Sequence, residues 1–496
     1  MSLHLDWFKS GTRYNQIYLY IETFHETSLL SFKVEMMKIP RLLWLIFGIS
    51  SLVLFFCASL RHWLFQSNAL DLGWFDQSLY LISQGKPPIV SFSEDHILGD
   101  HAAFIFYPLA LFYIIYPNVH WLFLVQAVAL SSAIIPLCLL AKQAGLKDNF
   151  SLTIVGVYLL YPLIFNVNLF DFHSEVIALP VIFWAVLAAR AKKFVQFIIA
   201  IVLILSCKAV LSLTVAAMGV WLLFFEKRKK SGLISLFLGV FWFIITTQLI
   251  ISRFSGDEVA AVGRYSFLGD SVTEIITNLF LQPNIILSRV FTLANLEYII
   301  LLFIPVIWGL NIRYLTPLVA AIPILALNIL TDYQPQKDLV HQYSIAILPF
   351  LLLSVIATLV AQKGLIRNPR YIIIWSLITF LALGKYGYFT SRYLEQIETT
   401  SAMREAVKLI PGEVKVLTSP QISPHLTHRT VIKLAIKDRE PIDIEQFDYI
   451  LLNTRYPGWE NSEETVTNLF EKLKNNNNYK LKYEKDGVIL WTNYRN

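Results

Sequence analysis

Long apolar segments are the feature that most constrains the fold of this 496-residue chain. Residues 42–60, 121–140, 233–251 and 348–360 are among the runs that approach the length of about 20 residues with which a helix crosses about 30 Å of hydrocarbon. Apolar residues make up 56% of the chain and charged residues 15%, which excludes a water-soluble globule of ordinary composition. The sequence therefore predicts an α-helical polytopic membrane protein with about 11–13 membrane helices.

Short basic loops recur along the chain and set its predicted orientation. Strict alternation of the spans after residue 142 puts all of them on one side: residues 141–147, 190–193, 226–230, 311–313 and 362–370. The positive-inside rule makes this side cytoplasmic. Because the segment before the first span is also basic, residues 61–101 form the first outer loop, and 102–116 is predicted to be a partial or re-entrant helix.

The composition predicts three regions. Residues 1–38 form a polar N-terminal extension that lacks the pattern of a signal peptide. Residues 39–391 form the membrane domain, with a long second outer loop at 253–297. Residues 392–496 predict a small soluble α/β domain on the non-cytoplasmic side, which ends in a hairpin turned at an Asp-Gly pair.

The first outer loop gathers acids and histidines directly after the first span. Carboxylates held at a membrane face water or a pocket and are often functional. Asp71 is predicted to be catalytic or to cap a helix over 70–83, and Asp76 with Gln77 to catalyse, to hold a ligand or to stabilise the fold. That helix has apolar residues at helical spacing, so we expect it to lie in the membrane interface.

The end of the same loop predicts a site for a divalent metal or a phosphate. His96, Asp100 and His101 stand at i, i+4 and i+5, which is a loose spacing for metal ligands. The three cysteines lie inside apolar segments without CxxC spacing, so we expect neither a disulfide framework nor a zinc site from them. The net charge of +6 is modest and lies mostly in loops of one side, which argues against nucleic-acid binding.

A second polar group follows a later span. Asp171, His173 and Glu175 alternate along the chain and share one face if this segment is extended, although Asp171 would equally serve as a helix cap. Their predicted side is that of the first outer loop, which favours one shared site. Lys208 stands between two apolar stretches and is predicted either to bind an anion such as a phosphate or to reach the interface with its ammonium group.

Three further candidates lie on the predicted outer side. His341 and Tyr343 open the span HQYSIAILPF, where His341 would otherwise be a polar residue at the start of a helix. Arg264 lies in the long second outer loop. It is predicted to contact an anionic headgroup, and the alternative is a solvated loop.

Four motifs resemble a known family. DLGWFDQ (71–77), HILGDH (96–101), NLFDFHSE (168–175) and HQYSIAILPF (341–350) look like those of a domain-of-unknown-function family of bacterial integral membrane proteins. The chain looks closest to a cyanobacterial branch, which shares the LTHR segment at 426–429. That family in turn resembles the GT-C glycosyltransferases, which move a sugar from a polyprenyl-phosphate carrier on the outer face of the membrane. The resemblance covers most of the chain from the first span onward.

The resemblance implies a set of site residues. The acid of the first outer loop would be Asp71 or Asp76, acting as the base that takes the acceptor's proton, and the second acidic site would be Asp171 with Glu175. Lys208 would contact the carrier phosphate, although the residue after it is an alanine where the family pattern has an acid. The other predicted substrate-binding residues are Gln77, His101, His173, Arg264, His341 and Tyr343.

The predicted function is a membrane glycosyltransferase of a bacterial inner membrane, with a polyprenyl-phosphate sugar as its lipid partner. The sequence leaves open the sugar, the acceptor, a metal requirement and protein partners. One alternative is a transporter or channel in which Asp171, His173 and Lys208 form an ion path, and another is an inactive scaffold. Against a transporter, the acids cluster at one surface and the sequence has no inverted repeat.

Overall fold

A computed structural model describes residues 40–256, 260–436, 443–458 and 463–494. The predicted polar extension at residues 1–38 lies outside them. The chain divides into two compact units, Met1–Trp44 and Leu45–Asn496. The candidate site and the soluble domain both belong to the second unit, which is the one described below.

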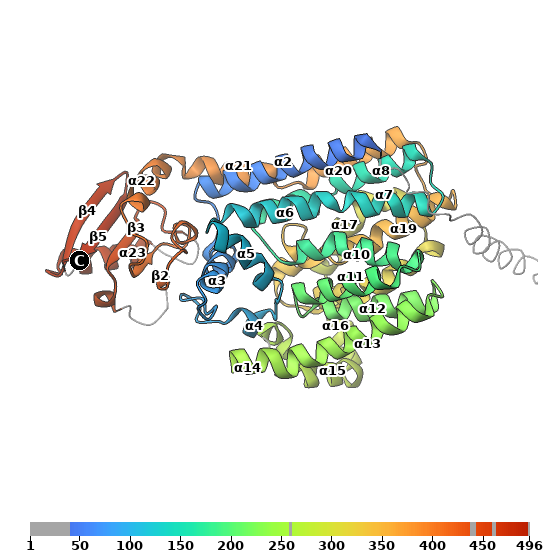
Figure 1. Cartoon of the computed structure of the whole chain (residues 1–496), viewed down its shortest axis with the longest axis horizontal. Coiled ribbons are helices and arrows are strands. Elements are labelled where there is room, and N and C mark those ends of the chain that lie inside the picture. The colour runs from blue at the N-terminus through green and yellow to red at the C-terminus, as the bar shows by residue number, and fades with distance from the viewer. Residues whose placement is uncertain (1–39, 257–259, 437–442, 459–462, 495–496) are drawn as a thin grey trace, which may run out of the picture. The chain divides into compact units, whose positions relative to one another are not determined.

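Apolar helices make up most of the described chain (Figure 1). Among the described residues, five are long enough to cross a membrane: Arg41–Trp63 (α2), His120–Gln143 (α6 and α7), Asp148–Phe170 (α8 and α9), Lys229–Ser255 (α13 to α14) and Pro369–Glu395 (α20 and α21). A bent pair, Pro283–Val290 (α16) and Leu293–Gly309 (α17 and η4), would be a sixth. Shorter apolar helices are Phe106–Ile115 (α5), Phe194–Cys207 (α11), Leu211–Phe224 (α12), Thr316–Leu330 (η6 and α18) and Leu348–Val360 (α19).

This architecture confirms a polytopic helical membrane protein. The predicted number of about 11–13 membrane helices is reached when the bent pair and the five shorter helices are counted with the five long ones, because several apolar runs break before they reach the length of a span. The predicted partial helix at 102–116 is the short helix α5, whose ten residues cannot cross a bilayer. The segment predicted to be the second outer loop is largely helical, since it holds η3 (Ala260–Leu268), α15 (Val272–Leu281) and α16.

Helices α12 and α13 (Lys229–Ile245) show why small residues matter in this bundle. A Cβ added at Gly219 would lie 2.3 Å from the backbone nitrogen of Leu236, and one added at Gly239 would lie 2.4 Å from that of Ala216. Membrane helices gain stability from such close backbone approach, since lipid offers no hydrophobic drive for their association. The glycines thus set the distance between the two helices.

The membrane domain has several further helices. Their bounds are η1 (Ala69–Gly73), α3 (Trp74–Ser83), α4 (Ile97–Asp100), α10 (Glu175–Arg190), η5 (Ile312–Tyr314), η7 (Gln334–Lys337) and η8 (Gln342–Ser344). Helix α3 is buried from Trp74 to Leu81. The prediction that this segment lies in the membrane interface is therefore wrong, because α5 and the soluble domain cover it.

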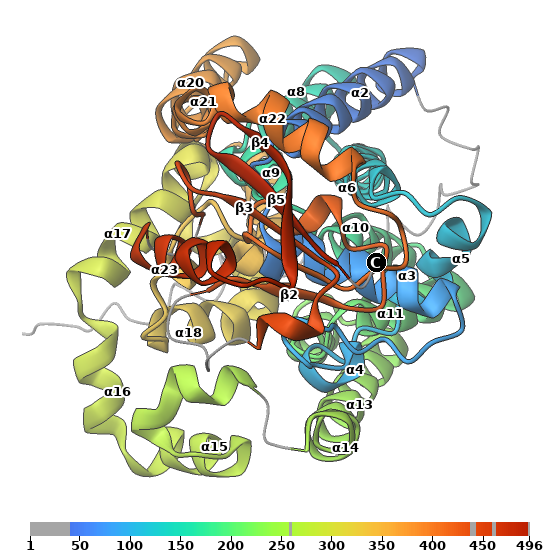
Figure 2. The ribbon, with the colours of Figure 1, turned by 90° about the vertical axis from the view of Figure 1, so that its left-hand side faces the viewer.

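The soluble domain is built on a five-stranded mixed sheet in the order β2-β1-β3-β5-β4. Its strands face the viewer in Figure 2 and are β1 (Val416–Thr418), β2 (Ile432–Leu434), β3 (Tyr449–Asn453), β4 (Tyr479–Lys485) and β5 (Val488–Asn493). Strands β2, β1 and β3 are parallel, whereas β5 is antiparallel to both β3 and β4. The helices of the domain are α22 (Ile397–Lys408), η9 (Ser423–His425), η10 (Ile444–Gln446) and α23 (Glu463–Lys474).

The predicted C-terminal hairpin is confirmed. Asp486 and Gly487 turn the chain between β4 and β5 with φ values of 50° and 81°. Two consecutive residues with positive φ define the turn that matches the twist of a two-residue hairpin, and Asp-Gly is a favoured pair for it. Strand β2 is only three residues long, and the sequence did not predict it.

Candidate functional site

A cavity of about 1640 Å³ opens among the helices of the membrane domain, and loops of the soluble domain contribute to its wall. Many of the predicted site residues line it: Asp71, Asp100, His101, His173, Glu175, Lys208, Arg264, His341 and Tyr343. Asp76, Gln77, His96 and Asp171 are absent from the lining. The structure therefore brings most of the candidates to one place and separates Asp71 from Asp76.

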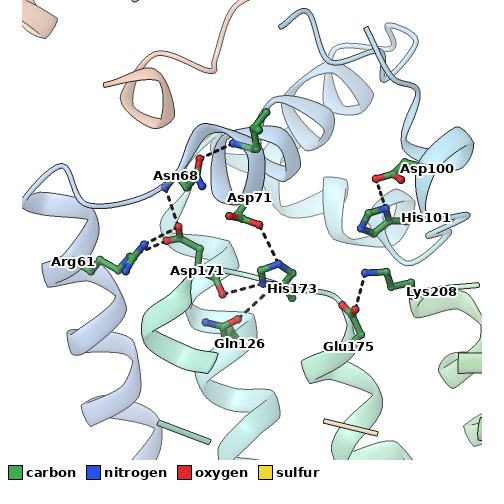
Figure 3. A network of polar contacts seen from close by, with 11 residues as sticks. Arg61, Asn68, Asp71, Asp100, His101, Gln126, Asp171, His173, Glu175 and Lys208 are labelled. Carbon is green, nitrogen blue, oxygen red and sulfur yellow. Dashed lines mark hydrogen bonds and ion pairs between the residues drawn. The ribbon is translucent and has the colours of Figure 1, made fainter. Parts of the chain in front are cut away.

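Asp71 and His173 form the first polar pair of the cavity (Figure 3). Asp71 lies in the π-helix η1, which begins after Asn68, whose side chain accepts a hydrogen bond from the nitrogen of Leu70. The Nε2 atom of His173 is 3.3 Å from Oδ1 of Asp71, and the imidazole stacks on Phe170. A π-turn inserted before an α-helix is often found at functional sites. Asp71 remains partly open to the cavity, whereas His173 is buried.

Glu175 and Lys208 form the second pair. Glu175 stands in the first turn of α10, and Lys208 follows the last residue of α11. The Nζ atom of Lys208 donates to Oε1 of Glu175 over 2.7 Å, while Oε2 of Glu175 is buried with no hydrogen-bond partner. The carboxylate that pairs with Lys208 thus comes from a different helix.

Asp100 and His101 form the third pair on the cavity wall. Burial opposes ionisation of Asp100, but the imidazole of His101 and the more distant Lys208 and Arg264 outweigh it and hold the pKa of Asp100 at about 2. The carboxylate is therefore charged at neutral pH. Its negative charge lies beside a histidine that points to the same cavity (Figure 3).

The predicted metal site is not formed. Within residues 40–494, leaving out the gaps named above, no group of three His, Cys, Asp or Glu side chains is arranged to hold a metal ion. The reason is local, because His96 precedes the four-residue helix α4 and its Nδ1 accepts the N–H of Leu98 over 3.1 Å. Its ring also stacks on Phe254, away from Asp100 and His101.

Asp171 holds the end of the first span and does not face the cavity. Its carboxylate accepts from Nε and Nη2 of Arg61, each over 3.3 Å, and from the backbone nitrogen of Asn68 over 2.9 Å (Figure 3). Burial raises the pKa of Asp171 to about 6, although Arg61 opposes the rise, so the carboxylate is ionised at pH 7. Asp171 therefore ties α2 to the segment that carries His173.

Asp76 and Gln77 bind the soluble domain instead of the cavity. Asp76 is buried and accepts hydrogen bonds from Tyr113, over 2.5 Å, and from Thr427, while Nε2 of His428 lies 3.1 Å away. Gln77 donates to the backbone oxygen of Arg429 and to Ser91. These two residues of α3 thus reach the LTHR segment at 426–429 that the sequence singled out.

Arg264 lies on the cavity wall between two aromatic rings. Its guanidinium carbon is 4.4 Å from the ring centre of Tyr333 and 5.4 Å from that of Tyr343, and Nη1 donates to Oε1 of Gln336 over 3.0 Å. Among the described residues, no carboxylate forms an ion pair with this side chain. A fixed cation held only by neutral groups suits an anionic ligand.

His341 belongs to a further carboxylate–imidazole pair on the lining. Its Nδ1 atom is 2.7 Å from Oδ2 of Asp338, and the other oxygen of Asp338 accepts the backbone N–H groups of Val340 and His341. The ring also meets the edge of Phe170, the same residue on which His173 stacks. The two histidines therefore contact the same aromatic side chain.

Sequence reasoning missed several residues that shape the site. Arg61, Asn68 and Gln336 were not predicted, although each holds a predicted residue in place. Arg61 carried a usable signal, since an arginine in the last turn of an apolar span needs an acidic partner. Gln336 gave none, because its neutral side chain stands in a polar segment without any motif.

The fold is similar to that of a solved integral membrane protein, ArnT. A crystal structure of ArnT from Cupriavidus metallidurans bound to undecaprenyl phosphate superposes with a TM-score of 0.50 at 12% identity, over 90% of this chain and 97% of that chain. The same protein in the apo state gives a TM-score of 0.50 at 11% identity, over 90% and 98%.

The family follows from the sequence. Residues 61–490 match the family described as "Predicted membrane protein (DUF2079)", and the chain belongs to this family. This confirms the resemblance to a family of unknown function with a GT-C-like fold, while a cyanobacterial origin stays a prediction. No curated protein matches the chain.

Proposed function

We propose that the protein transfers a sugar from a polyprenyl-phosphate carrier to an acceptor at the outer face of a bacterial inner membrane. One observation carries this proposal: a single cavity is lined by a partly open carboxylate, Asp71, and by several cationic side chains, among them Lys208 and Arg264. Such a set suits a reaction in which one group loses a proton and another leaves as a phosphate. The ArnT fold, which binds undecaprenyl phosphate in the related structure, supports the same reaction class.

Asp71 is the base in this proposal. Its carboxylate takes the proton of an acceptor hydroxyl group as the oxygen forms a bond to the anomeric carbon of the sugar. The bond from that carbon to the carrier phosphate breaks, and its electron pair leaves with the phosphate. His173 holds the carboxylate from one side, and the other predicted acid of the same loop, Asp76, is too enclosed by its own partners to reach the cavity.

Lys208 and Arg264 have different environments and therefore different roles in this proposal. Lys208 is neutralised by Glu175, so it supplies hydrogen-bond donors with little net charge. Arg264 forms no ion pair among the described residues, and its planar guanidinium matches phosphate oxygens. We assign the carrier phosphate to Arg264 and Tyr343, with Lys208 at the leaving oxygen. The histidines His101 and His341 remain candidates for further hydrogen bonds to the same group.

The carrier chain would lie along the apolar wall of the cavity. Leu70, Trp74 and Phe75 of the segment 70–83 contribute to this wall. Most of the apolar lining comes from other helices and includes Leu211, Phe243, Ile251, Ile276, Leu279 and Ile324. A cavity of this composition removes prenyl groups from water in proportion to their area.

Binding and transfer can be tested separately. Purified protein in nanodiscs is titrated with undecaprenyl phosphate and analysed by native mass spectrometry. A panel of polyprenyl-phosphate sugars is then incubated with the protein, and released polyprenyl phosphate is quantified by liquid chromatography and mass spectrometry. We expect binding that weakens at least tenfold in Arg264→Ala, and release that falls about 10²–10⁴-fold in Asp71→Asn.

Asp148→Asn is the matched control, since Asp148 is an exposed carboxylate paired with Lys142 away from the cavity. This variant should bind and release as the wild type does. Binding of bulk phospholipid only, unchanged by Arg264→Ala, would contradict the proposal. Solute or ion flux into protein-containing liposomes, lost in Lys208→Ala, would favour the transporter alternative.

A further inference from the structure

The soluble domain reaches into the membrane domain at one place, and this place adjoins Asp71. The segment 423–429 packs against the end of the π-helix that carries Asp71. A Cβ added at Gly73 would lie 3.6 Å from the side chains of Ser423 and Thr427 and 3.7 Å from that of Pro424, which is ordinary van der Waals contact. The soluble domain therefore forms one wall of the turn from η1 into α3.

Hydrogen bonds fix the same contact. Asp76 in α3 accepts from Thr427 and lies 3.1 Å from His428, and Gln77 donates to the backbone oxygen of Arg429 over 3.0 Å. Arg429 in turn donates to the backbone oxygens of Pro411, Val414 and Leu426, which ties its loop to the domain. The partners of α3 are thus parts of a held loop and not of a free tail.

Further contacts extend this interface along the first outer loop. Ser91 donates to the backbone oxygen of Ile432 and accepts its N–H, over 2.8 and 2.9 Å. Tyr80 donates to Glu413 over 2.6 Å, and Lys86 donates to Thr430 over 2.8 Å. Because a buried carboxylate needs several donors to remain charged, Asp76 is the most demanding member of the interface.

We propose that the soluble domain positions the catalytic carboxylate: residues 423–429 hold Asp76, and Asp76 fixes the π-helix that presents Asp71 to the cavity. The role of Asp71 rests on the proposed function, whereas the contact itself does not. Asp76 is in this view a positioning residue, because it does not line the cavity. A π-helical turn is rare and needs outside support, and the segment 423–429 supplies it.

The interface also carries a titratable pair. His428 faces Asp76 and the rings of Tyr80 and Tyr113, at 5.2 and 5.8 Å between centroids, with Arg429 beside it and His62 further away. Burial lowers the pKa of His428, but the carboxylate of Asp76 outweighs this and raises it above the ordinary value. The contact should therefore loosen as the pH rises through that raised value.

Hydrogen–deuterium exchange of the full-length protein in nanodiscs tests the proposal without any substrate. Thr427→Val removes the hydroxyl donor at nearly constant volume, and Thr427→Ser retains it. We expect exchange at residues 69–83, corrected for intrinsic rates, to accelerate at least tenfold in Thr427→Val and to stay within twofold of the wild type in Thr427→Ser. In the wild type, exchange at residues 69–83 should also accelerate as the pH rises above the raised pKa of His428. The variant His428→Gln should not show this pH-dependent acceleration.

Two further readouts separate positioning from general damage. The affinity of Thr427→Val for undecaprenyl phosphate should stay within twofold of the wild type, because the cavity residues are unchanged. The rate at which this variant releases polyprenyl phosphate should fall at least tenfold. Unchanged exchange at 69–83 in Thr427→Val would overturn the proposal, as would acceleration spread evenly over all helices and not restored by Thr427→Ser. If the wild type fails to bind undecaprenyl phosphate, the proposed function falls and the exchange result still decides the positioning role of the soluble domain.

Discussion

The buried pair between Arg61 and Asp171 allows a prediction that separates a structural acid from a catalytic one. Asp171→Asn keeps the size of the side chain and removes its charge, which leaves the guanidinium of Arg61 buried without a counterion. Loss of one member of a buried ion pair costs about 3–5 kcal/mol. The φ of 117° at Asp171 is strained at a non-glycine residue, but asparagine has the same strain, so it does not change the difference.

The expected loss for Asp171→Asn is therefore about 3 kcal/mol or more of unfolding free energy. The single variant Arg61→Met should lose a similar amount, because it leaves the carboxylate with the backbone N–H of Asn68 as its hydrogen-bond partner. Replacing both members of a buried ion pair is often close to neutral, so the double variant should regain most of the loss and the two single losses should not add. Unfolding free energies from SDS titration in mixed micelles measure all four corners of this cycle.

Transfer activity completes the test. If Asp171 only ties α2 to the segment at 171–175, the double variant should release polyprenyl phosphate at close to the wild-type rate. If Asp171 is catalytic, the double variant will be stable and inactive. A single variant Asp171→Asn whose unfolding free energy lies within about 1 kcal/mol of the wild type would refute the reasoning, since the loss of the ion pair would then cost little stability.

Three further outcomes are expected. Lys208→Ala should weaken undecaprenyl-phosphate binding and destabilise the protein by about 3–5 kcal/mol, because Glu175 is left unpaired. The double variant with Glu175→Gln should recover stability but not binding. Thermal unfolding measures the stability, and native mass spectrometry measures the binding. Gly239→Val should lower the unfolding free energy by more than Gly263→Val, since only the first adds a Cβ within 2.4 Å of a neighbouring backbone. The stability difference between the wild type and His428→Gln should be fully present below the ordinary histidine pKa of 6.5 and should vanish as the pH rises through the raised pKa of His428 in the folded state. The reason is that the folded state binds the proton of His428 more tightly than the unfolded state does. Denaturant titrations at a series of pH values measure this difference.

The sequence predicted much of the fold for identifiable reasons. Span length and composition determine a helical membrane protein, and the Asp486 and Gly487 pair determines the C-terminal hairpin. The interfacial position of the segment 70–83 could not be judged, because apolar spacing shows that one face is buried but not by what. Its cover comes from residues 426–429, far away in the sequence.

The candidate site was predictable as a set of residue types but not as a set of pairs. Polar residues at one membrane depth indicated one shared site, and the cavity contains most of them. Pairing depends on contacts between distant segments, so the sequence could not tell Asp71 from Asp76, nor find Glu175 as the partner of Lys208. The predicted metal ligands His96, Asp100 and His101 show the same limit. Their spacing along the chain does not predict a shared metal site, because the helix between them is only one turn long.

The pairing of charges in the cavity leads to a last argument about the ligand. Each acid on the lining that the sequence singled out has a basic neighbour: Asp71 has His173, Asp100 has His101, and Glu175 has Lys208. An apolar wall makes an unpaired charge costly, so such pairs are what an empty cavity needs for its own stability. Arg264 differs from these paired residues, since among the described residues only neutral groups contact its guanidinium. A guanidinium kept in this state is stabilised when an anion arrives, and the phosphate of a lipid carrier is an anion that reaches such a place from the membrane.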